Sequence, residues 1–132
     1  MFIKEITYTD YNNETRTEEA CFHLSPAELT ELECTTPGGL KNTLETAIKT
    51  KNGPEVMQFF KKLVQMAYGV KSPDGRRFMK SEEIWRNFSE TEAYVELFMQ
   101  LVTDENAARE FAEKVIPDMN KYVPKTQDAV VR

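Results

Sequence analysis

The chain has 132 residues, 40% of them hydrophobic and 30% charged, which is typical of one soluble domain that buries roughly two thirds of its unfolded surface without a metal or disulfide staple. Its net charge of -5 argues against nonspecific nucleic-acid binding, because a phosphate backbone is bound by clustered positive charge. The chain shows no signal-peptide pattern and no apolar run near the roughly 20 residues that cross a bilayer, so we do not expect it to enter membranes. It has only two cysteines, so we expect a reduced, cytoplasmic protein.

The first 24 residues predict a β-hairpin. Residues 2–9 alternate apolar and polar side chains and are rich in β-branched and aromatic types, as in a half-buried strand. Turn-forming residues follow, and a second alternating run at 15–24 places Ala20, Phe22 and Leu24 on one face. Two strands alone are marginally stable, so this hairpin should pack on helices or on another chain.

Two helices are predicted next. Ser25 and Glu28 can form a capping box at the start of the first, which should run to about Cys34. Residues 35–39 interrupt the pattern with a proline and two glycines. Apolar residues at helical spacing resume at Leu40 and stop at an Asn-Gly pair.

The strongest helical pattern lies at residues 55–68. Apolar residues recur there at i, i+3, i+4 and i+7, and Lys61 and Lys62 fall on the opposite face. Gly69 fits the left-handed cap that ends many helices. We expect this helix to lie at the centre of the fold.

A basic patch surrounds the turn signal Ser-Pro-Asp-Gly at 72–75. Its flanks could pair as a short hairpin or remain an ordered loop. Lys71, Arg76, Arg77 and Lys80 are the only concentrated positive charges, and they suit acidic residues of a partner or a phosphate. Alternatively the patch is a solvated loop that nearby glutamates neutralise.

Three further helices complete the pattern. Ser81 should cap a short helix that carries Trp85 and Phe88, Ser89 to Glu92 should form a second capping box, and a last helix should begin at 103 or 104 and stop at Pro117. The predicted fold is α+β and mainly α-helical. It places the hairpin (1–24) on a bundle of about five or six helices (25–116), all in a single domain (1–116), followed by a mobile C-terminal tail (117–132).

Catalytic candidates are few. His23 is the single histidine, and no ligands with metal spacing lie near it in sequence, so we expect no metal site and no cofactor. A dyad of His23 with Cys21 or Cys34 is possible in principle. The abundant glutamates fall at helix starts or on polar faces, where they complement the helix dipole.

Aromatic residues near the basic patch add a second candidate surface. Most must fill the core, but tryptophan, tyrosine and arginine often anchor interfaces. The predicted partner-binding residues are Lys71, Arg76, Arg77, Phe78, Lys80, Trp85, Phe88 and Tyr94.

Residues 67–117 carry a family likeness. The run contains AYGVK, DGRRF, EIWRNF, TEAYVELF and AAREFAEKVIP in this order. In order and type, these elements resemble the tail assembly chaperones of long-tailed bacteriophages. The resemblance implies a non-enzymatic protein of the host cell cytoplasm that is absent from the mature virion. It would bind the tape measure protein, keep its apolar helices soluble, and recruit tail tube (major tail) subunits.

A protein that holds a helical, apolar tape measure should offer apolar grooves between helices with charges at the rim. Self-association is also open, whereas nucleic-acid and membrane partners are not expected. Two alternatives remain: a structural or head-tail connector protein retained in the virion, and a small cytoplasmic enzyme that uses His23.

Overall fold

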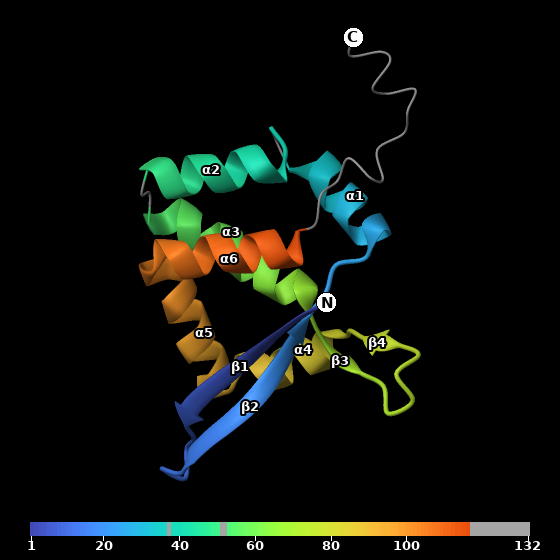
Figure 1. Cartoon of the computed structure of the whole chain (residues 1–132), viewed down its shortest axis with the longest axis vertical. Helices are drawn as coiled ribbons and strands as arrows, with labels where there is room; N and C mark the ends of the chain where they lie inside the picture. The colour runs from blue at the N-terminus through green and yellow to red at the C-terminus, as the bar shows by residue number, and fades with distance from the viewer. Residues whose placement is uncertain (37, 51–52, 117–132) are drawn as a thin grey trace.

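A computed structural model describes residues 1–36, 38–50 and 53–116 (Figure 1). The predicted mobile tail, 117–132, lies outside these residues. The fold is α+β and mainly helical, as predicted. That residues 1–116 form a single domain stays our proposal.

The N-terminal hairpin forms as the alternating pattern predicts. Strand β1 (Phe2–Thr9) pairs antiparallel with β2 (Thr15–Phe22). At the connecting turn, the carboxylate of Asp10 accepts hydrogen bonds from two backbone amides, and Asn13 adopts a φ of 62°. Asparagine tolerates this left-handed conformation, which explains its use at the turn.

The hairpin is extended into a four-stranded sheet. Strands β3 (Tyr68–Lys71) and β4 (Phe78–Met79) continue it in the order β1-β2-β3-β4. The strands β2 and β3 meet where Cys21 lies opposite Gly69. The sequence left the flanks of the basic turn open between a hairpin and a loop, and the structure makes them a hairpin.

Gly69 has a different role from the one predicted. The central helix ends at Ala67, and Gly69 lies in β3 rather than at a left-handed helix cap. A Cβ atom at Gly69 would stand 2.5 Å from Cε2 of the Phe78 ring and 2.9 Å from the carbonyl oxygen of Met79. Glycine is therefore needed here because the neighbouring strand approaches closely.

Six helices are seen in the described part of the chain. They are α1 (Pro26–Thr35), α2 (Leu40–Thr50), α3 (Gly53–Ala67), α4 (Glu82–Ser89), α5 (Glu92–Thr103) and α6 (Glu105–Val115). The capping box of Ser25 and Glu28 is present. The second predicted box is not: Thr91 caps α5, whereas the Ser89 hydroxyl donates to the Arg86 carbonyl and ends α4.

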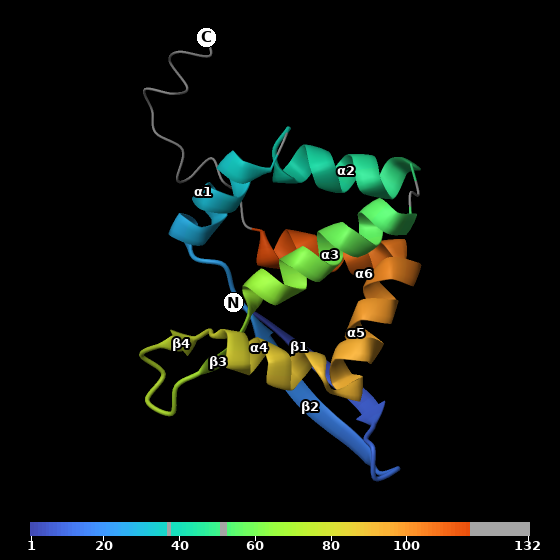
Figure 2. The ribbon, with the colours of Figure 1, turned by 180° about the vertical axis from the view of Figure 1, so that it is seen from behind.

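The core lies between the sheet and the helices. Strand β1 packs against α5 and α6, and the ring of Phe22 contacts the ring of Phe111 at 5.1 Å between centroids. Helix α3 is buried along Phe60, Leu63, Val64 and Ala67, which confirms its central position. In both views α2 lies at the end opposite the β1–β2 turn, with α3 and α6 between them (Figures 1 and 2).

Candidate functional site

The basic turn is an ordered hairpin end. Backbone hydrogen bonds run from the Ser72 amide to the Arg77 carbonyl and from the Gly75 amide to the Ser72 carbonyl, both at 2.8 Å. Gly75 adopts a φ of +75°, the left-handed conformation that glycine tolerates best. Lys71, Arg76 and Arg77 are exposed on this turn.

Ser72 holds the turn from inside. Its side chain is only 3% exposed, and its hydroxyl donates to Asp74 Oδ1 at 2.6 Å while accepting from the Arg77 amide at 3.0 Å. The bond from the Ser72 hydroxyl and a further one from the Arg76 amide favour the ionised carboxylate, so they lower the pKa of Asp74. The turn therefore keeps one shape with its cations on the outside.

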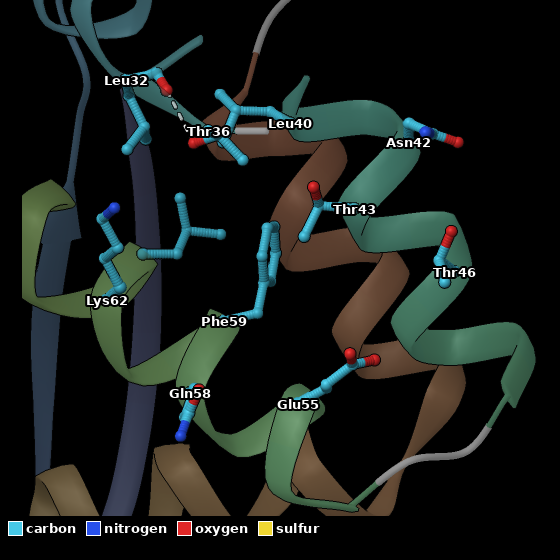
Figure 3. Close-up of a pocket in the computed structure, with 11 residues that line it drawn as sticks. Leu32, Thr36, Leu40, Asn42, Thr43, Thr46, Glu55, Gln58, Phe59 and Lys62 are labelled. Atoms are coloured by element: carbon cyan, nitrogen blue, oxygen red, sulfur yellow. Dashed lines mark hydrogen bonds between the residues drawn. The ribbon is translucent and has the colours of Figure 1, made fainter. Parts of the chain in front are cut away.

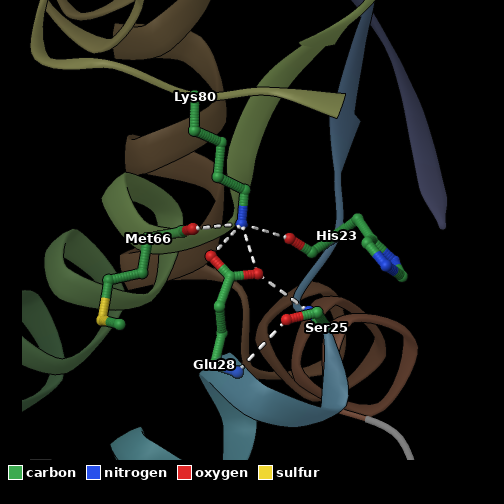
Figure 4. A network of polar contacts seen from close by, with 5 residues as sticks. All are labelled: His23, Ser25, Glu28, Met66 and Lys80. Carbon is green, nitrogen blue, oxygen red and sulfur yellow. Dashed lines mark hydrogen bonds and ion pairs between the residues drawn. The ribbon is translucent and has the colours of Figure 1, made fainter. Parts of the chain in front are cut away.

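Lys80, the fourth cation of the predicted patch, is used inside the protein (Figure 4). Its ammonium donates to the carbonyl oxygens of His23 at 2.7 Å and Met66 at 2.8 Å, and to both carboxylate oxygens of Glu28 at 2.8 and 3.0 Å. It thus joins the end of the sheet, the start of α1 and the end of α3.

The Glu28 carboxylate completes this network. Burial alone would raise its pKa, but the hydrogen bond from Lys80 and that from the Ser25 amide outweigh burial and hold the pKa below its ordinary value. The sequence pattern indicates Glu28 only as part of a helix cap and Lys80 only as a surface charge. Their pairing depends on contact between distant segments.

Three of the four predicted aromatic residues, Trp85, Phe88 and Tyr94, form a cluster with Tyr68 where α4 and α5 pack together. Phe88 is buried and stacks on Tyr68 with centroids 4.0 Å apart. Trp85 and Tyr94 are half-buried, and their rings pack edge to face with centroids 5.3 Å apart. Phe78 lies at the base of the basic turn, where its ring packs against the His23 ring with centroids 6.0 Å apart. Packing accounts for much of this cluster, and its role in partner binding stays a prediction.

An apolar groove lies between α1, α2 and α3 (Figure 3). It has a volume of about 600 Å³, and its apolar side chains are Leu32, Leu40, Phe59 and Leu63. Its polar lining residues are Thr36, Asn42, Thr43, Thr46, Glu55, Gln58 and Lys62.

The sequence predicts the three helices but not this groove. Periodicity within one helix carries no signal for it, because the groove depends on how the helices lie relative to one another: in both views α2 and α3 are closest where α2 ends and α3 begins, and they separate toward α1 (Figures 1 and 2). None of the methionines that the structure describes is among the lining residues of the groove: on α3, for example, Met57 is exposed and Met66 is half-buried.

His23 sits beside the sheet rather than in a reactive cluster. Its amide donates to the Ala67 carbonyl at 2.9 Å, and burial together with nearby positive charge lowers the pKa of its imidazole. In the described segments, no three histidine, cysteine or acidic residues are placed to hold a metal ion. No helix in the same segments is long and apolar enough to cross a bilayer.

Comparison with known proteins identifies the family of this chain. No curated protein sequence and no solved structure matches it. A family model described as "Phage tail assembly chaperone" matches residues 1–129, nearly the whole length, including the hairpin and first helices that the quoted motifs do not reach. The chain therefore belongs to the phage tail assembly chaperone family.

Proposed function

We propose that this chain binds the tape measure protein, keeps it soluble, and recruits tail tube subunits while the tail is built. It does so by binding and release, with no catalytic residue, in the host cell cytoplasm. Family membership supports the general role in tail assembly. The finer steps rest on the surfaces of the structure.

The groove between α1, α2 and α3 is the observation that carries this proposal. Its apolar floor and polar edge suit an amphipathic helix, which lays its apolar face into such a groove. Phe59 is the largest apolar side chain in the lining and is only half-buried. An occupant that covered Phe59 would gain from removing this surface from water.

Co-expression with the tape measure protein tests the proposal. We expect the tape measure to remain in the soluble fraction only when this chain is present, and the two to co-elute in size-exclusion chromatography. A tape measure that stays insoluble while this chain elutes alone would contradict the holdase role. Detection of this chain in purified virions by mass spectrometry would instead favour the structural or connector alternative.

A charged substitution in the groove tests whether this surface, and not another, binds the tape measure protein. Phe59→Glu should abolish co-elution, because a carboxylate would replace the exposed apolar ring. Met57→Glu places the same charge on an exposed face of α3 outside the groove lining, so it should co-elute as the wild type does. Gln58→Arg places a bulkier side chain at the edge of the groove without removing a core contact. It therefore serves as the second test of the groove if Phe59→Glu lowers the melting temperature.

A further inference from the structure

Three of the four cations around the turn have no acidic partner among the residues that the structure describes. Lys71, Arg76 and Arg77 are exposed, and no carboxylate in the described ranges lies within ion-pair distance of any of them. Glu82 and Glu83, which could have neutralised the patch, make no such pair. We call these three residues the basic prong.

The prong is held rigid at its base as well as at its tip. Gly69 lies under the Phe78 ring, and Lys80, beside β4, is fixed by its four contacts. The β3–β4 turn projects from one side of the molecule in both views (Figures 1 and 2). A cationic surface that is already ordered loses little conformational freedom on binding, so its contacts contribute more to affinity.

The groove lies along α3, and the prong lies beyond the C-terminal end of this helix. The groove residues of α3 run from Glu55 to Leu63, and the helix ends at Ala67. At a rise of about 1.5 Å per residue Leu63 is about 6 Å from this end, and Lys71 lies four strand residues, roughly 13 Å, further along the chain. A ligand can therefore contact the prong without filling the groove.

We propose that the basic prong binds an acidic segment of a protein partner. Two adjacent arginines can each take a carboxylate in bidentate geometry. The one carboxylate of the turn, Asp74, is committed to Ser72 and the Arg76 amide, which leaves three cations against one anion. The partner relieves their mutual repulsion and orients the two proteins.

A protein segment fits this surface better than a nucleic acid. The whole chain has a net charge of -5, so the surface outside the prong is more acidic still. A nucleic acid that crossed several phosphates would meet this acidic surface and be repelled. A short acidic peptide needs only the prong.

A titration of the full chain provides the test. The probe is a synthetic peptide of alternating glutamate and alanine, added at low ionic strength to isotopically labelled protein and followed by NMR. We expect the amide resonances of residues 71–78 to shift most, and the paired variant Arg76→Glu, Arg77→Glu to weaken binding by about tenfold or more. The variant should keep the wild-type melting temperature, because neither guanidinium makes an ion pair in the described structure.

A matched control makes the outcome decisive. Lys61→Glu with Lys114→Glu changes the net charge equally at exposed sites on α3 and α6, and should leave peptide binding unchanged. The proposal is overturned if both paired variants weaken binding alike, if neither does, or if single-stranded DNA or inorganic phosphate shifts the same resonances more strongly than the peptide. Tape measure solubilisation by the Arg76, Arg77 variant is scored separately, so failure of the groove and failure of the prong remain distinguishable.

Discussion

Lys80 and Glu28 stand 52 positions apart in sequence, yet their side chains form an ion pair at 2.8 Å. The pair connects the capping residue of α1 to the segment between β4 and α4. Because Lys80 also binds two backbone carbonyls, it is a structural tie between parts of the fold that sequence alone does not relate.

Removing this tie should destabilise the protein. Lys80→Met leaves the Glu28 carboxylate without its cation and two carbonyl oxygens without a donor, so we expect a loss of about 2 kcal/mol in the free energy of unfolding. Chemical denaturation measures it. Lys114→Met, at an exposed site in α6, should change stability by less than about 0.5 kcal/mol, and equal losses in both variants would refute the structural role of Lys80.

Acid should weaken the same contact. The folded-state pKa of Glu28 is lowered below the ordinary value of 4.5, so in this pH range the unfolded chain binds the proton more readily than the folded one. The stabilisation is complete above pH 4.5 and is lost as the pH falls through the folded-state pKa. Denaturation curves across this range should show that Glu28→Gln loses less stability on acidification than the wild type. Parallel losses would contradict the assignment.

Gly69→Ala should be strongly unfavourable. The new methyl group would clash with the Phe78 ring and the Met79 carbonyl, and overpacking of this kind costs about 1–3 kcal/mol. Gly53→Ala is the matched control, because no atom of the described residues lies within 4 Å of a Cβ atom there. Thermal unfolding should show a lower melting temperature for the first variant and no decrease for the second.

Ser72→Ala should loosen the basic turn. The variant loses a buried hydroxyl that donates to Asp74 and accepts from the Arg77 amide, which should lower stability by about 1–2 kcal/mol. Hydrogen exchange at the Arg77 amide should accelerate relative to amides in α3. Thr103→Ala removes an exposed hydroxyl bonded within α5 and should leave exchange in the turn as it is in the wild type.

The sequence predicted features that depend on local rules. The alternation in residues 2–9, the capping box at Ser25 and the helical spacing through α3 each depend on neighbours within a few positions, and all three are confirmed. The Ser-Pro-Asp-Gly turn was predicted for the same reason. At these points the structure is decided by residues close together in sequence, so it can be predicted from the sequence alone.

Long-range contacts decided the features that were missed. Gly69 fits a helix cap locally, but pairing of β3 with β2 and β4 makes it a strand residue. Lys80 resembles its basic neighbours in sequence, and only the approach of α1 and α3 removes it from the surface. The groove depends on how three helices diverge, which periodicity within each helix does not specify.

The contact between Phe2 and Phe111, with ring centroids 5.8 Å apart, brings β1 against α6. During translation the β1–β2 hairpin leaves the ribosome before α6 does, so the apolar face of the hairpin is fully covered only when α6 has been synthesised. The nascent protein therefore completes its core late, and any stop before α6 would leave that face open to water and to other chains.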